Sequence, residues 1–191
     1  MYKEDQSIRM QLIELSKAVT TEGQSSLIDS LVAVIEKQHQ IDQRNIAFVD
    51  SLLQIGLPQG LSKAAYNAIW IIIDHSDLTS QEKHLPFIKQ MVDEDKIKFK
   101  DYATLYDRIE MNNNRPQQYG TQLIQFGTPD SLQLYLWPVE NIDILDSLRH
   151  YAGFDSISKY LDAVSNTMGI KVNYNPNLTI QELNNMKNQH K

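Results

Sequence analysis

Residues 62–75 read SKAAYNAIWIIIDH, and this stretch decides the fold. From Ala64 onward, apolar residues cover nearly every side of a helix drawn through it, so this helix is expected to be central. Ser62 suits the N-cap position, and the helix is predicted to run from about Lys63 to His75. A buried strand is the alternative for the isoleucine run, since β-branched residues suit strands, but the alanines before it favour a helix.

Two amphipathic helices are predicted before this stretch. Over residues 3–19, apolar residues including Val19 recur at helical spacing, and Asp5 falls on the same stripe. Over residues 27–52, the corresponding stripe is interrupted by Gln38 and Asn45. A polar group on an inward face needs a hydrogen-bond partner, or it costs about 1 kcal/mol or more. These polar residues either line a pocket or serve structure, Asp5 at a frayed helix end and the other two as register-fixing contacts.

The sequence after residue 75 predicts mostly helix. Thr79 and Glu82 fit a capping box at the start of the next helix, and Thr179 and Glu182 fit another near the C-terminus. Helical spacing of apolar residues predicts three further helices between them, over residues 101–111, 143–151 and 155–168.

One segment departs from the helical period. From residue 122 apolar and polar residues alternate, which predicts a β-hairpin over residues 122–138 with a turn at 127–130. The predicted fold class is therefore mainly α, a helical bundle with one β-hairpin. With 191 residues, 41% of them apolar, the chain can bury a core as a single domain over residues 1–191. Residues 170–191 are predicted to form a partly frayed C-terminal extension.

Composition excludes several classes of function. The chain has no cysteine, which removes disulfides, thiolate metal sites and cysteine nucleophiles. A net charge of -6 disfavours nucleic acid as a partner. No apolar run is long enough to insert into a membrane, so a soluble protein is predicted, either cytoplasmic or exported after loss of a signal peptide. No cofactor-binding fingerprint and no strong metal-ligand spacing is present, so neither a cofactor nor a metal is predicted.

The polar stretch over residues 107–122 is the most informative for function. Its candidate site residues are Asp107, Arg108, Arg115, Gln117, Tyr119, Gly120, Thr121 and Gln122. The two guanidinium groups suit two-point recognition of a carboxylate or phosphate, while the glutamines and the tyrosine supply neutral hydrogen bonds. Gly120 would let the backbone approach a ligand, and Asp107 is a candidate catalytic carboxylate. The structural alternative is that an acid such as Asp107 pairs with an arginine and pins the loop to the hairpin.

His75 and Asp77 are the other candidate catalytic residues. His75 ends the predicted central helix, and an imidazole moves protons in either direction near neutral pH. Asp77, two residues on, could orient the ring. The alternative is a helix-terminal histidine that is hydrogen-bonded to the backbone.

Several of these polar residues resemble the motifs of a bacterial domain family of unknown function. The matching positions run through residues 5–161 and are Asp5-Gln6 with Arg9, Asp42 with Asn45, His75-Ser76-Asp77 with Gln81, Asp107-Arg108, and the run Arg115-Pro116-Gln117 with Tyr119-Gly120-Thr121-Gln122. The sequence departs from the family pattern at Asp74, Ser76 and Asn114, where the family has Gln, Ala and Gly. The resemblance implies a shared polar site, to which Asp5, Arg9 and Asn45 would contribute ligand-binding groups, and it implies no particular activity.

These observations predict an enzyme or a ligand-binding domain for a small anionic molecule, and they leave catalysis itself open. In this interpretation Arg108 and Arg115 bind the anion and His75 exchanges protons with it. The reaction would be a hydrolysis, an elimination or an isomerisation, without a covalent intermediate. The alternative is a noncatalytic protein-interaction module that docks through Tyr119, Tyr135 and Trp137, because aromatic and arginine residues often anchor such surfaces.

Overall fold

The computed structural model describes residues 2–22, 25–127 and 132–189. Within these residues it contains eight helices and three short strands, which confirms the predicted mainly α class. The chain divides into two compact units, Met1–Ile97 and Lys98–Lys191. The single domain expected from the sequence stays a prediction.

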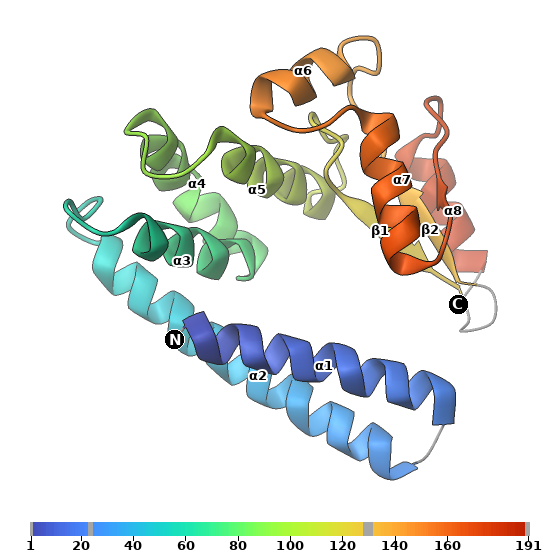
Figure 1. Cartoon of the computed structure of the whole chain (residues 1–191), viewed down its shortest axis with the longest axis horizontal. Coiled ribbons are helices and arrows are strands. Elements are labelled where there is room, and N and C mark those ends of the chain that lie inside the picture. The colour runs from blue at the N-terminus through green and yellow to red at the C-terminus, as the bar shows by residue number, and fades with distance from the viewer. Residues whose placement is uncertain (1, 23–24, 128–131, 190–191) are drawn as a thin grey trace. The chain divides into compact units, whose positions relative to one another are not determined.

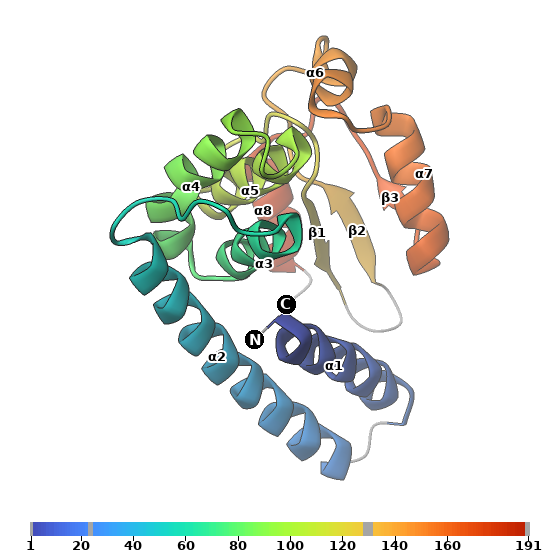
Figure 2. The same ribbon diagram turned by 60° about the vertical axis from the view of Figure 1, so that its left-hand side comes forward.

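The first unit consists of four helices among the described residues. Helix α1 (Tyr2–Glu22) runs antiparallel to the long helix α2 (Ser25–Leu53), as Figures 1 and 2 show. Helix α3 (Lys63–Asp74) packs against α2, and α4 (Leu78–Asp93) packs against α3. The predicted apolar stripes meet between these helices, and the side chain of Val19, which belongs to one stripe, lies outside the described residues.

Helix α3 forms where the sequence predicts a central helix. The hydroxyl of Ser62 accepts a hydrogen bond from the N–H of Ala65 at 3.2 Å, so Ser62 is the N-cap. Ile69 and Ile72 are buried, and Ile73 is fully buried. The segment is a helix and not a strand. Ile72 and Ile73 follow Ile69 by three and four residues, which places the buried isoleucines on one side of the helix.

Helix α4 begins two residues earlier than the predicted capping box implies. Its N-cap is Asp77, whose carboxylate accepts from the N–H of Ser80 at 2.9 Å. The capping box assigned to Thr79 is wrong, because an aspartate two residues before it already satisfies the free N–H groups of the first turn.

The second unit combines helices with a three-stranded sheet. Helix α5 (Phe99–Asn112) leads into β1 (Leu123–Phe126), which pairs antiparallel with β2 (Gln133–Leu136) and confirms the predicted hairpin. Most of the turn predicted at 127–130 lies outside the described residues. A short strand β3 (Val172–Asn173), which the sequence did not predict, pairs parallel with the other edge of β2.

Helices cover both faces of this sheet. Successive side chains of β2 point to opposite faces, so Leu134 and Leu136 pack with Leu161 of α7 (Ile157–Met168). On the opposite face Trp137 packs with Leu183 of α8 (Ile180–Gln189).

The C-terminal residues belong to the core of the second unit. Residues 172–189, for which the sequence predicts a partly frayed extension, form β3 and α8, and Leu183 is fully buried. The predicted capping box is confirmed: the carboxylate of Glu182 accepts from the N–H of Thr179, whose hydroxyl accepts from the N–H of Glu182.

Helix α6 (Leu145–Ala152) precedes α7. Among the helices described, none is both long and apolar enough to cross a membrane.

Replacement of Ile73 by alanine tests the central position of α3. Ile73 is fully buried, so Ile73→Ala should lower the free energy of unfolding by about 2 to 5 kcal/mol, as measured by urea denaturation. The matched control is Ile55→Ala, because Ile55 is 98% exposed and its loss should change stability by less than about 0.5 kcal/mol. Equal stability of the two variants would show that α3 is peripheral.

Candidate functional site

His75 is held in a fixed position at the end of α3. It is the C-cap residue, and its N–H donates to the carbonyl of Ile71 at 3.0 Å. The buried side chain of Gln81 donates to the carbonyls of Asp74 and Ser76, at 2.9 and 3.0 Å. Because both carbonyls flanking His75 are bound by one side chain, the turn that presents the imidazole is anchored to α4.

Two buried carboxylates lie beside the imidazole of His75. Its Nδ1 is buried and lies 3.6 Å from Oδ2 of Asp5, and its Nε2 lies 4.0 Å from Oδ2 of Asp74. The His75 side chain is 26% exposed, whereas both carboxylates are almost completely buried. The carboxylate beside Nδ1 is thus that of Asp5, from a helix more than sixty residues away in the chain.

Arg9 joins Asp5 to the second helix. Its Nε donates to Asp5 at 3.1 Å, and its terminal nitrogen donates to Asp42 of α2 at 2.7 Å. Gln6 also donates to Asp5, at 2.8 Å. Asp5 and Arg9, both predicted as ligand-binding residues, therefore form one hydrogen-bonded network with His75 nearby.

The pairing of α1 with α2 places Asn45 close to this network. Arg9 pairs with Asp42, and Glu4 pairs with Arg44 at 2.6 Å, so the turn of α2 that follows Asp42 lies across from Asp5. Asn45 is 1% exposed, and neither polar atom of its carboxamide has a hydrogen-bond partner among the described residues. A buried amide without partners is costly and marks a place where a further polar group fits.

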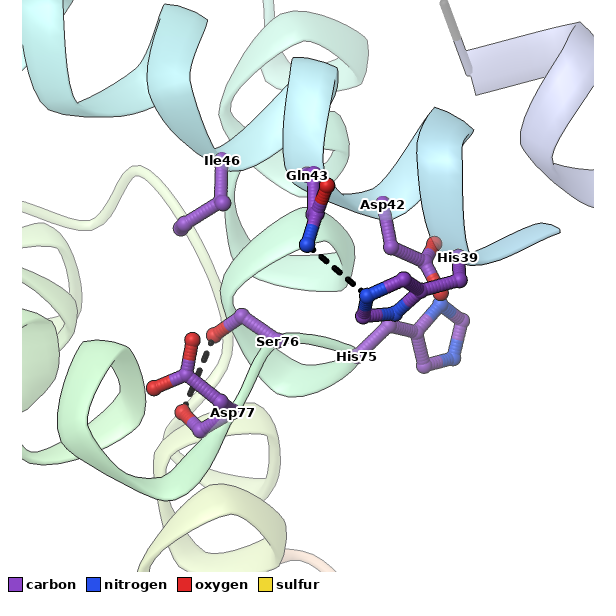
Figure 3. Close-up of a pocket in the computed structure, with 7 residues that line it drawn as sticks. All are labelled: His39, Asp42, Gln43, Ile46, His75, Ser76 and Asp77. Atoms are coloured by element: carbon purple, nitrogen blue, oxygen red, sulfur yellow. Dashed lines mark hydrogen bonds between the residues drawn. The ribbon is translucent and has the colours of Figure 1, made fainter. Parts of the chain in front are cut away.

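A pocket of about 250 Å³ opens beside the network. Figure 3 shows its lining side chains, which come from α2 and from the turn between α3 and α4: His39, Asp42, Gln43, Ile46, His75, Ser76 and Asp77. In the part of the chain that the structure describes, no arginine or lysine belongs to this lining. The pocket therefore presents two imidazoles and two carboxylates to an entering molecule.

The charges around Asp42 act in opposite directions. Burial raises the pKa of the Asp42 carboxyl and the neighbouring Asp5 raises it further, whereas Arg9 lowers it. The net direction is upward, because the effect of burial, with that of Asp5, exceeds the effect of Arg9.

Asp77 has a structural partner of its own. Both of its carboxylate oxygens accept from Ser80, at 2.9 Å from the N–H and 3.1 Å from the hydroxyl. In Figure 3 its carboxylate points away from the imidazole of His75. The structure thus places Asp77 as a helix cap on the rim of the pocket.

In the second unit Asp107 organises the loop that carries most of the predicted site residues. It is fully buried and accepts hydrogen bonds from the N–H groups of Gln118, Tyr119 and Thr121 at 2.8 to 3.0 Å, and from the Thr121 hydroxyl at 2.9 Å. Burial raises the pKa of the Asp107 carboxyl, and these hydrogen bonds lower it. The carboxylate thus accepts the hydrogen bonds of three N–H groups in this loop, for which no backbone carbonyl is needed.

Gln117 and Gln122 fix the same loop to the sheet. The Gln117 carboxamide donates to the carbonyls of Gln122 and Trp137, at 3.1 and 2.7 Å, and accepts from the N–H of Gln122 at 2.8 Å. The Gln122 side chain donates to the carbonyl of Thr104 at 3.3 Å. Both side chains thus act as structural bridges.

Arg149 completes this framework from α6. Its side chain is buried and donates to the carbonyls of Tyr119, Gly120 and Asp155, at 2.7 to 2.9 Å. Gly120 has a φ of +65°, and a Cβ there would lie 3.2 Å from Ile157. Glycine is therefore required at this position by backbone conformation and close packing.

The remaining predicted residues of this stretch differ in exposure. Arg115 makes a two-point pair with Glu110, at 2.8 and 2.7 Å, and its side chain is 53% exposed. Arg108 is half-buried. Tyr119 and Trp137 are buried, which removes them as exposed docking anchors, and burial raises the pKa of Tyr119 to about 12.

Sequence reasoning missed Asp74 and Arg149 as buried polar residues and did not place Asp42 in the site. For Arg149 a signal existed, since it lies at helical spacing from Leu145 and Ala152 on the buried face of α6. For Asp42 the signals were its place beside Asn45 in the family motif and its spacing of three residues from Asn45, which puts both on the same face of one helix. Asp74 carried no such signal. Among the described residues, no group of three or more histidine and carboxylate side chains could hold a metal ion.

A model of a family of unknown function, DUF6624, matches residues 1–173. The chain belongs to this family. The match confirms the resemblance noted from the sequence, and it includes both the His75 network and the Asp107 loop, while α8 lies beyond it. Comparisons with curated proteins and with solved structures find no match.

Replacement of Asp107 by asparagine tests its structural role. In the variant, the amide N–H groups of asparagine would face the N–H donors of the loop, where the wild-type protein has an acceptor oxygen. Asp107→Asn should therefore lower the free energy of unfolding by about 3 to 5 kcal/mol. Asp162→Asn, at an exposed position of α7, is the control with the same change of charge. Wild-type stability of Asp107→Asn would contradict the role assigned to the carboxylate.

Replacement of Asp77 tests its capping role. Asp77→Ala should lower stability by about 0.5 to 2 kcal/mol, whereas Asp77→Ser, which keeps an acceptor oxygen, should lose less. The Ser80 N–H lowers the pKa of Asp77 below its usual 3.8, so the capping contribution is complete above that value and is lost as the pH falls through the lowered pKa. The stability difference between wild type and Asp77→Ala, measured by urea denaturation, should therefore shrink at acid pH. A pH-independent difference would show that the charge of Asp77 contributes nothing.

Proposed function

We propose that this protein is an enzyme that transfers a proton to or from a small molecule bound in the pocket beside His75. The observation that carries the proposal is the convergence of Asp5, Arg9, Asp42 and His75, from α1, α2 and the end of α3, next to a pocket. Ionisable side chains that gather beside a pocket, where neighbouring charges and burial act on them, are candidates for a functional site.

In this proposal Nε2 of His75 exchanges the proton with the ligand. The Nδ1 atom is buried on the side of Asp5, which stabilises the imidazolium form by its negative charge. Arg9 holds Asp5 and Asp42 in place by hydrogen bonds to both. Asp5 and Arg9 are thus positioning residues, and His75 is the residue that contacts the ligand.

The charge of the pocket supports a neutral or positively charged ligand group at this position. Asp42 and Asp77 line it without an arginine or lysine, and Asp5 and Asp74 lie behind it. Such a surplus of negative charge concentrates cations and repels anions. The anionic ligand predicted from the sequence rested on Arg108 and Arg115, which belong to the second unit.

The proposed chemistry is addition or removal of a proton without a covalent intermediate. Among the residues that line the pocket, Ser76 is the one hydroxyl, and it donates to the carbonyl of Ile73 at 2.7 Å. A serine bound in this way is not activated by a base. Hydrolysis by an activated water, elimination and isomerisation all fit this arrangement.

A substitution of His75 tests the proposal. The purified protein would be screened for turnover of small neutral and cationic amides, esters and amino compounds. For a substrate found in this way, His75→Gln should lower kcat by about 100- to 10,000-fold, since glutamine cannot exchange protons.

The matched control is His150→Gln, at an exposed position of α6, which should keep full activity. Melting temperatures would show that both variants are folded. Turnover that survives His75→Gln in a folded protein would refute the role of His75.

A further inference from the structure

A second pocket in the second unit has a different chemical character from that beside His75. It encloses about 360 Å³, within the usual range of small-molecule sites of about 300 to 1,000 Å³. Its polar side chains are four carboxamides and one ammonium group, from Asn112, Asn114, Gln125, Asn184 and Lys187. Among the described residues, none that lines it carries a carboxylate, although the chain contains 24 acidic residues.

Three elements build this pocket. Asn112 ends α5, and Asn114 follows with a φ of +56°, a left-handed conformation that asparagine tolerates better than most residues. Gln125 belongs to β1. Asn184 of α8 donates to the carboxamide oxygen of Asn114 at 3.0 Å, which links α8 to the end of α5.

The pocket also has apolar lining residues. Ile124 of β1 is half-buried and packs in the same cluster as Trp137, on the sheet face that α8 covers, and both residues line the pocket. The indole N–H of Trp137 donates to the carbonyl of Arg115 at 2.8 Å, so the ring contributes carbon atoms rather than a donor. A lining that combines amide groups with carbon atoms matches a ligand that has both hydroxyl and C–H groups.

The charge balance favours a neutral ligand. The C-terminal end of α5 carries a partial negative charge from its last carbonyls, which opposes the single positive charge of Lys187. A carboxamide both donates and accepts, as does a hydroxyl group, so two carboxamides can bind neighbouring hydroxyls of one ring. A strongly charged ligand would find neither the cations nor the carboxylates that it requires.

We propose that this pocket binds a carbohydrate, of one or two sugar residues. Asn114 and Asn184 hold the ring hydroxyls, Lys187 donates to a further oxygen, and Ile124 and Trp137 contact the apolar face of the sugar. The site is independent of the reaction proposed at His75.

Part of this site lies outside the family match. Asn184 and Lys187 belong to α8, and the match ends at residue 173. The sugar site therefore combines β1 and the end of α5, which the match includes, with a helix beyond it.

Sugar titrations of the full chain test the proposal. Glucose, galactose, N-acetylglucosamine and maltose would each be added while the side-chain amide signals of asparagine and glutamine are followed by NMR. At least one sugar should shift the signals of Asn114, Gln125 and Asn184 in a saturable manner. Asn184→Ala should lower the affinity for that sugar by about 3- to 10-fold, which is the effect of losing one or two neutral hydrogen bonds.

The adjacent residue provides a matched control. Asn185 is exposed and does not line the pocket, so Asn185→Ala should bind the same sugar as wild type does. The proposal is overturned if none of the four sugars shifts these signals, or if Asn184→Ala and Asn185→Ala bind equally well. It is also overturned if propionate shifts the same signals where the sugars do not, since the site would then recognise an anion.

Discussion

A carboxylate removed from water must be met by hydrogen-bond donors, and each of the two units is organised around one such group. In the first unit Asp5 is met by Arg9 and Gln6, with the imidazole of His75 nearby. In the second, Asp107 is met by three backbone N–H groups and one hydroxyl of a single loop. The same constraint gives a cluster of side chains in the first unit and an ordered backbone turn in the second.

This difference separates residues whose hydrogen bonds are made within one loop from residues that border a pocket. Around Asp107 the donors and acceptors of Gln117, Thr121 and Arg149 are used within the protein, which makes the loop a rigid support. Around Asp5 the network borders a pocket, and the carboxamide of Asn45 has no partner within the described residues. Asn45 is not among the residues that line this pocket, so its carboxamide lies behind the pocket wall.

The sequence allowed the helices and the hairpin to be predicted because their signals are local. Ser62 and the isoleucine run predicted α3, and the alternation of apolar and polar residues predicted β1 and β2. β3 was not predicted because two residues carry no period, and its pairing depends on β2, nearly forty residues earlier. The polar residues were recognised by type, yet their partners could not be inferred. Arg9 binds a residue 33 positions away and Gln117 one 20 positions away, and spacing along a helix gives a face without identifying what lies opposite.

The parallel pairing of β2 with β3 has a consequence for the order in which the chain folds. The hairpin of β1 and β2 is local and can form soon after it leaves the ribosome, whereas β3 follows only after α6 and α7 have been synthesised. During that interval the outer edge of β2 has unpaired backbone groups beside Leu134 and Leu136, and such an edge can pair with another nascent chain. A slowdown of synthesis between residues 137 and 171 would prolong this exposure, so the yield of folded protein should depend on the rate of translation across this segment.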